Sequence, residues 1–212
     1  MSETAVTARR SHTRERLMDA AVALFAAKGV LGASVEEICE RAEFTRGAFY
    51  SNFADKDELC LAVLDRQAAR ELAATEKAVA ALQGRVLDAR NIEELVESAL
   101  SVFLAAQPRG SEDLVANMEL RLYAIRNPSL RGPLLALNDR MCGRVGGLLT
   151  DAVHQVGAEL LVPIDQAIDL LHAVYTHSGS NALLHGLEPD DRSRHVQLTA
   201  LLRSLVTGAA SS

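Results

Sequence analysis

Residues 34–59 read SVEEICERAEFTRGAFYSNFADKDEL, and this stretch predicts two short helices joined by a tight turn. Ser34 can cap the first helix with its hydroxyl, and the glutamate three residues on completes a capping box. A turn is expected at residues 42–44, and Thr45 can cap a second helix that runs to Ser51. Two short helices with a three-residue turn have the dimensions of a helix-turn-helix.

Apolar spacing indicates which face of this helix pair is buried. Val35, Ile38 and Ala42 can face a preceding helix, and Phe49 and Phe53 can lock the second helix in place. This arrangement leaves a second set of side chains toward solvent, namely Arg46, Gly47, Tyr50, Ser51 and Asn52.

The exposed set suits a DNA duplex. Arg46 can donate two hydrogen bonds to a guanine edge, and Gly47 lets the helix backbone approach the floor of the groove. Hydroxyl and amide groups suit phosphate oxygens, and the candidates are Ser34, Thr45, Tyr50 and Asn52. Lys56 adds a positive point charge beside them.

Three segments together resemble the N-terminal domain of the tetracycline-repressor (TetR) family of bacterial transcription regulators. They are TRERLMDAAVALFAAKG at 13–29, SVEEICERA at 34–42 and TRGAFYSNFADKDEL at 45–59. The resemblance covers about residues 13–73, and its most specific part is the run from Arg46 to Lys56. It implies a homodimer that inserts residues 45–51 into the major groove of a palindromic operator. It also implies base reading by Arg46 and Gly47, with phosphate contacts from Ser34, Thr45, Tyr50 and Lys56.

One position departs from the family pattern. The turn usually contains Ala-Gly-Val, whereas this chain has Ala42-Glu43-Phe44. If Glu43 adopts the left-handed conformation that glycine adopts there, the cost is about 1 kcal/mol. Its carboxylate also places a negative charge near the side that faces DNA.

The rest of the chain predicts helices almost throughout. Apolar spacing of 3.6 residues recurs, and alternating strand patterns are missing. The expected ranges are about 55–81, ending near Gly84, 92 to Pro108, 112–126, 129–156, 163–186 and 190–206. With the helices before residue 55, this is an all-α protein of about nine helices and no strand.

The resemblance divides the chain into a flexible leader (1–12), a DNA-binding domain (13–73) and an effector-binding and dimerisation domain (74–212). It places the dimer interface on the last two helices, where the small polar run 177–181 would let paired helices approach closely; a crowded contact within one chain is the alternative. A small-molecule pocket needs an apolar lining with a few polar groups. The candidates, for which ordinary core packing is the alternative, are Phe103, Met118, Leu122, Tyr123, Met141, His172 and Tyr175.

Charge and aromatic residues are unevenly distributed. The chain has 212 residues and a net charge of −6, all of it carried by residues 54–212 because the first 53 residues are neutral. Five of the eight aromatic side chains lie in those first 53 residues. We therefore expect DNA binding to depend on one favourable face rather than on total charge.

Other function classes find little support. No metal-site, nucleophile-elbow or nucleotide-loop pattern is present, so we expect no catalytic residue, no metal and no cofactor. Three cysteines without a C-x-x-C pair, no membrane span and no secretory signal favour the cytoplasm. A helical small-molecule sensor or enzyme that does not bind DNA remains the alternative.

Overall fold

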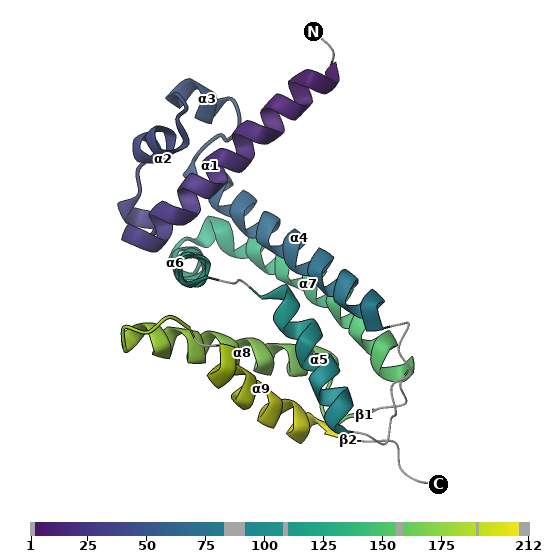
Figure 1. Cartoon of the computed structure of the whole chain (residues 1–212). Helices are drawn as coiled ribbons and strands as arrows, with labels where there is room; N and C mark the ends of the chain where they lie inside the picture. The colour runs from purple at the N-terminus through teal and green to yellow at the C-terminus, as the bar shows by residue number, and fades with distance from the viewer. Residues whose placement is uncertain (1–2, 83–91, 108–109, 156–158, 190, 208–212) are drawn as a thin grey trace. The chain divides into compact units, whose positions relative to one another are not determined.

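The computed structural model describes residues 3–82, 92–107, 110–155, 159–189 and 191–207, and these ranges are almost entirely helical (Figure 1). The helices are α1 (Glu3–Gly32), α2 (Val35–Ala42), α3 (Arg46–Tyr50), α4 (Lys56–Leu82), α5 (Ile92–Ala106), α6 (Ser111–Arg126), α7 (Pro128–Gln155), α8 (Ile164–Leu184) and α9 (Asp191–Leu205). The predicted all-α class is confirmed. The expected helix ends at Gly84 and Pro108 lie outside the described residues.

A short strand pair is the feature that the sequence pattern did not predict. β1 (Glu159–Leu160) and β2 (Val206–Thr207) pair antiparallel, with Glu159 opposite Thr207. Strands of two residues are too short to show a period-2 pattern, so periodicity gives no signal for them.

The helices form two compact units. The N-terminal unit comprises Met1–Gln67 and Glu112–Leu137, and the C-terminal unit comprises Ala68–Ser111 and Asn138–Ser212. Both α4 and α7 contribute residues to each unit, and the domain boundary expected at residue 73 falls inside α4.

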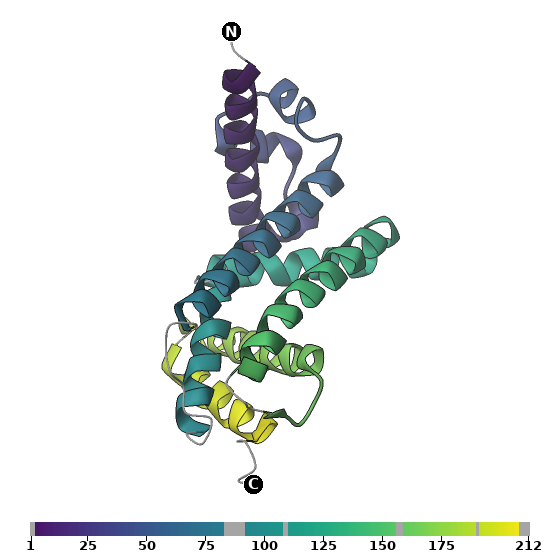
Figure 2. The ribbon, with the colours of Figure 1, turned by 90° about the vertical axis from the view of Figure 1, so that its right-hand side faces the viewer.

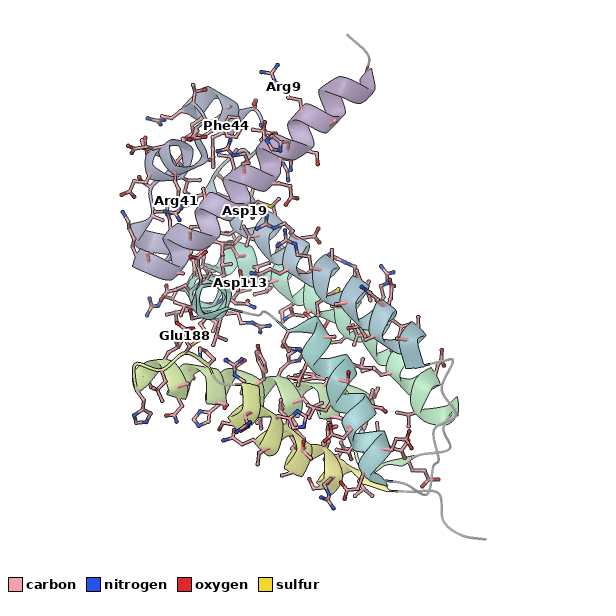
Figure 3. All side chains as sticks on the ribbon, in the orientation of Figure 1. Arg9, Asp19, Arg41, Phe44, Asp113 and Glu188 are labelled. Carbon is pink, nitrogen blue, oxygen red and sulfur yellow. The ribbon has the colours of Figure 1, made fainter. Side chains whose placement is uncertain are left out.

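α1 begins earlier than the sequence predicts. It includes most of the expected flexible leader, because residues 3–12 are helical, with exposed Arg9 labelled in Figure 3. This first part of the helix is polar and has no apolar stripe, which is the signal that sequence reasoning requires. Near the other end, Gly29 interrupts the helix with a φ of +75°, as expected for a C-terminal glycine.

The core of the N-terminal unit joins α1, α2, α3 and the start of α4 (Figure 2). Its largest fully buried side chains include Leu17 and Phe25 from α1, Ile38 from α2, Phe49 from α3 and Leu59 from α4. Phenylalanine fills this small volume with few residues, and Phe25, Phe49 and Phe53 account for three of the five aromatic residues in the first 53 positions.

Two polar clusters attach α4 to other helices of the same unit. Arg66 on α4 is largely buried and contacts Glu15 at 2.9 Å and Asp19 at 2.7 Å, both on α1. Asp57, in the first turn of α4, accepts hydrogen bonds from Tyr123 (2.7 Å) and Asn127 (2.8 Å). Burial and this carboxylate raise the pKa of Tyr123 to about 12. These contacts hold the first half of α4 in place.

The C-terminal unit has its core where α5, α8 and α9 meet, and both ribbon views show α8 beside α9. The buried cluster contains Val96 and Leu100 from α5, Leu171 and Tyr175 from α8, and Leu198 and Leu202 from α9. Each helix contributes two residues four positions apart, so the predicted apolar stripes are the faces that are buried.

Candidate nucleic-acid interface

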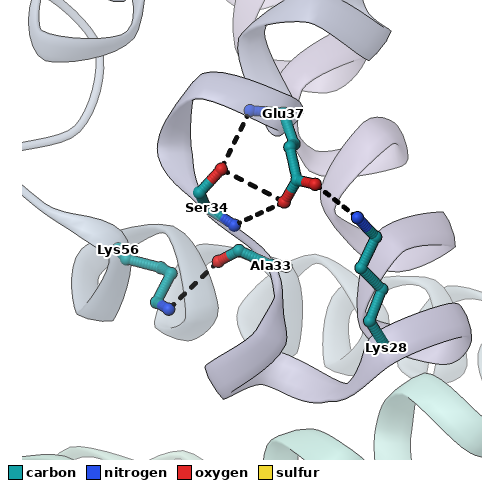
Figure 4. Close-up of polar contacts among 5 residues, drawn as sticks. All are labelled: Lys28, Ala33, Ser34, Glu37 and Lys56. Atoms are coloured by element: carbon teal, nitrogen blue, oxygen red, sulfur yellow. Dashed lines mark hydrogen bonds and ion pairs between the residues drawn. The ribbon is translucent and has the colours of Figure 1, made fainter.

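Ser34 caps the N-terminus of α2 and forms the predicted capping box. Its hydroxyl accepts the backbone N–H of Glu37 at 3.2 Å, and the Glu37 carboxylate accepts the backbone N–H of Ser34 at 3.0 Å (Figure 4). Lys28 on α1 donates to the same carboxylate. The hydrogen bond from Lys28, followed by those from Ser34, lowers the pKa of Glu37 to about 2. These bonds hold the N-terminus of α2 against α1.

The turn between α2 and α3 depends on a left-handed glutamate. Glu43 has φ 60° and ψ 38°, and is the only non-glycine residue with positive φ in the described part of the chain. Its N–H bonds the carbonyls of Cys39 and Glu40, which ends α2, and its carboxylate lies 2.7 Å from Nη2 of Arg16 on α1. The following Phe44 (Figure 3) lies with its ring centre 5.5 Å from the Arg16 guanidinium. Glu43 therefore adopts the left-handed conformation that glycine usually adopts at this turn.

α3 is a short helix with a capped N-terminus and a buried aromatic side. The Thr45 hydroxyl accepts the backbone N–H of Ala48 at 3.2 Å, which makes Thr45 the predicted N-cap. Phe49 and Phe53 are fully buried, with ring centres 5.7 Å apart. The predicted anchoring of the second helix by these two rings is confirmed.

The opposite face of α3 is open. Arg46 is 59% exposed and Tyr50 is 50% exposed, and Gly47, Thr45 and Ser51 are exposed beside them. A side chain at Gly47 would meet only the Thr45 hydroxyl within 4 Å, so this surface is not crowded by its own helix pair. Hydrogen-bond donors therefore lie on a face that no described residue of the N-terminal unit covers.

Arg46 has a carboxylate partner that sequence reasoning did not single out. Its Nη1 lies 2.6 Å from Oε1 of Glu36, in the first turn of α2, and its guanidinium lies 5.9 Å from the ring centre of Tyr50. Hydrogen bonding with Tyr50 and the charge of Glu36 raise the pKa of Arg46. Glu36 is ten positions earlier in the sequence, so only the fold of the helix pair brings the two together.

The expectation that Asn52 faces solvent is wrong. Its side chain is buried and donates from Nδ2 to the carbonyl of Ala48 at 2.8 Å. The amide thus closes the end of α3 and is not presented to a phosphate. Arg14 on α1, which the sequence reasoning did not select, donates to the Asn52 carbonyl and lies 4.2 Å from the ring centre of Phe53. Arg14 therefore fixes the end of α3 from thirty-eight residues away.

Lys56 is half-buried and has a structural partner. Its Nζ donates to the carbonyls of Val30 (2.9 Å) and Ala33 (3.1 Å), just past the kink in α1; the Ala33 bond is drawn in Figure 4. Carbonyls at a helix end lack partners within the helix, and a cation there satisfies them. Lys56 thus stabilises the junction of α1 and α2. This role comes in addition to the positive charge that the sequence predicts it to supply beside the exposed face.

The expected ligand candidates fall in different places. Phe103 and His172 line a cavity of about 90 Å³ in the C-terminal unit. Met141 and Tyr175 pack in the hydrophobic clusters of the same unit. The three remaining candidates, Met118, Leu122 and Tyr123, lie on α6 in the N-terminal unit and do not line this cavity.

The surroundings of all three cysteines disfavour the thiolate form. Burial raises the pKa of Cys39 and raises that of Cys60 to about 12, and burial with nearby carboxylates raises the pKa of Cys142. A thiol with a raised pKa forms little thiolate at neutral pH, and the thiolate is the reactive form. In the described ranges, no three potential metal ligands gather into one cluster, and no helix is long and apolar enough to span a membrane.

Known proteins resemble the chain both locally and along most of its length. Residues 17–63 match the family described as bacterial regulatory proteins, tetR family. The HTH-type transcriptional regulator UidR of Escherichia coli (strain K12) is 26% identical over 199 residues, which cover 92% of each chain. The HTH-type transcriptional regulator SrpR of Pseudomonas putida is 44% identical over 57 residues, or 27% of each chain.

Solved structures share the fold at lower identity. The regulator FadR from Bacillus subtilis in complex with stearoyl-CoA aligns with a TM-score of 0.66 and 17% identity, covering 90% of this chain and 97% of its own. The reduced form of NemR from E. coli aligns with a TM-score of 0.59 and 18% identity, covering 94% of this chain and 100% of its own.

The anchored, capped helix pair with an open α3 face defines a helix-turn-helix DNA-binding protein. Residues 17–63 match the TetR-family model, and along most of its length the chain is similar to an HTH-type transcriptional regulator.

Proposed function

We propose that the protein is a dimeric repressor that a small-molecule effector releases from a palindromic operator. The observation that carries the proposal is the open face of α3, where Arg46 and Gly47 occupy the first turn and Tyr50 the last position. The buried Phe49 holds the helix from the other side. A helix exposed and supported in this way can enter the major groove with its N-terminal residues against base edges.

The contacts divide into base reading and phosphate binding. Arg46 donates a pair of hydrogen bonds to a guanine, and Gly47 lets the backbone approach the bases. The exposed hydroxyls beside them contact phosphates and come from Ser34, Thr45, Tyr50 and Ser51. Lys56 reaches a phosphate with the one N–H of its ammonium group that the carbonyls of Val30 and Ala33 leave free.

Local ion pairs explain how a DNA-binding face tolerates four glutamates between residues 36 and 43. Glu36 pairs with Arg46, Glu37 with Lys28 and Glu43 with Arg16. Three of the four negative charges are thus offset within the N-terminal unit. Because few cations remain in surplus, we expect affinity to depend on the geometry of the dimer and to fall as salt rises.

The proposed dimer forms through the last two helices. Large apolar side chains are exposed on or beside them, with Leu184 at 84%, Val196 at 64%, Leu187 at 62% and Leu170 at 42%. A two-fold interface of this kind sets two α3 helices on one duplex. In this assignment residues 13–73 bind DNA, residues 74–212 bind the effector and dimerise, and the protein acts in the cytoplasm.

Release of DNA follows from differential binding. An effector that prefers a state with another spacing of the two α3 helices must weaken operator binding, because half-sites lie about 34–36 Å apart. A coupling of about 1–3 kcal/mol changes operator affinity about 5- to 150-fold. The FadR structure, which is a complex with stearoyl-CoA, supports a small-molecule effector for this fold.

Selection from random duplexes tests the proposal. The full-length protein should enrich a palindrome with half-sites about one helical turn apart, and light scattering should give twice the chain mass of 22.8 kDa. Arg46→Ala should cost about 1–3 kcal/mol on that operator and relax the sequence preference. Arg41→Ala, which removes the same charge from α2, is the control and should leave the preference unchanged. No enriched palindrome, or a monomer at micromolar concentration, would overturn the proposal.

A further inference from the structure

The cavity in the C-terminal unit is enclosed mostly by aliphatic side chains. It has a volume of about 90 Å³ and lies among α4, α5, α7, α8 and α9. Val102 and Phe103 line it from α5, Val145 and Leu149 from α7, and Ile168 and Leu171 from α8. A lining of this kind accepts a short hydrocarbon segment, and its size excludes a large ring system.

Polar side chains meet the cavity at one corner, which we call the Glu71 corner and define as Glu71, Thr75, Gln107 and His172. Nε2 of His172 lies 3.3 Å from Oε1 of Glu71 and also 3.3 Å from Nε2 of Gln107. Glu71 and His172 are each about one-third exposed, whereas Gln107 and Thr75 are buried. The corner is therefore the partly open end of an otherwise apolar cavity.

The hydrogen bonds at this corner cannot all be made at once. Gln107 also donates from its amide nitrogen to the carbonyl of Phe103, so that nitrogen faces His172 as a donor. If Nε2 of His172 accepts this donor, it has no hydrogen for Glu71. If Nε2 carries a hydrogen and donates to Glu71, the Gln107 donor faces another donor. One of these two hydrogen bonds, from Gln107 to His172 or from His172 to Glu71, is therefore always missing. A ligand that donates its own hydrogen bond to Glu71 lets His172 accept from Gln107, so that both groups have a partner.

Charge selects the kind of ligand head. Among the described residues that line the cavity, Glu71 and His172 are the ionisable ones, and neither lysine nor arginine is present. A carboxylate or phosphate head would lie beside Glu71 without a lysine or arginine partner, which is unfavourable. An ammonium head would instead form a charge-assisted hydrogen bond with Glu71.

We propose that the effector is a small amphiphilic amine, with an aliphatic tail in the cavity and a protonated head on Glu71. This inference rests on the proposed function, in which the C-terminal residues hold the effector site. It goes further by naming the ligand class and the residue that selects it, since Glu71 was not among the residues that the sequence singled out.

Three probes with the same five-carbon tail test the ligand class, namely 1-pentylamine, 1-pentanol and hexanoate. Calorimetry on the full-length protein at about pH 8, where the amine and carboxylates are charged, measures their binding. The amine should bind about tenfold more tightly than the alcohol, and hexanoate more weakly than both. The inference would be overturned if hexanoate bound as tightly as the amine or more tightly, or if no probe bound.

Two variants identify the site. Glu71→Gln should remove the preference for the amine over the alcohol, because the uncharged amide no longer attracts the ammonium head. Glu76→Gln is the matched control, because Glu76 lies on the same helix, pairs with Arg144 at the surface and does not line the cavity. Ala106→Leu fills the cavity and should abolish binding of all three probes while helicity is retained. An amine preference that survives Glu71→Gln would overturn the assignment.

Operator release is measured separately, so the two proposals can fail independently. If the amine binds with the stated preference but leaves the operator occupied, effector-controlled repression is wrong and the ligand class stands. If hexanoate rather than the amine releases the operator, repression by effector stands and the ligand class is wrong.

Discussion

Arg46 and Glu36 form an ion pair between α3 and α2, with Nη1 of the arginine 2.6 Å from Oε1 of the glutamate. Both side chains are more than half exposed, so the pair lies on the surface that we propose for DNA. An exposed pair of this kind is screened by solvent and contributes little to stability. The residue proposed to read a base is therefore already held by a carboxylate, and DNA must compete with that carboxylate.

Glu36→Gln should strengthen DNA binding. The substitution frees the Arg46 guanidinium and removes a negative charge from the proposed phosphate-facing surface, and we expect a gain of about two- to fivefold in affinity. The operator should gain more than non-specific duplexes, because the freed Arg46 reads a base whereas the lost charge carries no sequence information. Fluorescence anisotropy at fixed salt measures both affinities.

The matched control is Glu188→Gln, which makes the same charge change in the C-terminal unit, at the side chain labelled in Figure 3. It should change neither affinity. A loss of specificity in Glu36→Gln would show instead that Glu36 holds Arg46 in its base-reading position.

Lys56→Ala should reduce DNA binding and fold stability together. Losing a phosphate contact weakens all sequences alike and lowers the slope of log affinity against log salt by about one. Losing the bonds to the carbonyls of Val30 and Ala33 should also reduce the free energy of unfolding by about 1–3 kcal/mol. Salt titrations and denaturant unfolding measure the two effects.

Lys77→Ala removes the same charge from an exposed position on the same helix. It should change neither the salt slope nor the free energy of unfolding. If Lys56→Ala lowers stability but leaves the salt slope unchanged, the phosphate contact is wrong. If the slope changes and stability does not, the carbonyl bonds contribute nothing measurable.

Glu43 offers a test of backbone strain in the turn. Glu43→Gln keeps a side chain in the left-handed conformation and removes the Arg16 pair, whereas Glu43→Gly also removes the steric cost of that conformation. The glycine variant should therefore be more stable than the glutamine variant by about 1 kcal/mol. Denaturant unfolding of both proteins gives the difference, and equal stability would show that the turn is not strained.

Local signals in the sequence predicted most of the helix pair. The capping box at Ser34, the Thr45 cap and the buried Phe49 all depend on residues within a few positions, where spacing is informative. The all-α class followed from the same periodicity.

Contacts between distant residues could not be predicted in this way. Asn52 is buried at the end of α3, and Arg14 reaches its carbonyl from α1; Lys56 reaches the end of α1 from 26 positions away. The Glu71 corner brings together α4, α8 and the residue after α5, with Gln107 and His172 separated by 65 positions. Periodicity says which face of a helix is buried but not which partner covers it.

The pH dependence of stability tests the contacts of Glu37. Its pKa is about 2 in the folded protein, compared with an ordinary value of 4.5. The hydrogen bond from Lys28 is the largest cause, and the hydrogen bonds from Ser34 come next. A carboxylate with a lowered folded pKa contributes stability above its unfolded pKa and loses that contribution as pH falls toward the folded value. The contribution should therefore be complete above about pH 5 and lost near pH 2.

Glu37→Gln removes the titration, so thermal unfolding across this window should show a smaller loss of stability than in wild type. Lys28→Met, which removes the strongest partner, should raise the pKa of Glu37 in an NMR titration. Parallel pH curves for wild type and Glu37→Gln would show that the capping-box carboxylate does not stabilise the fold through its charge.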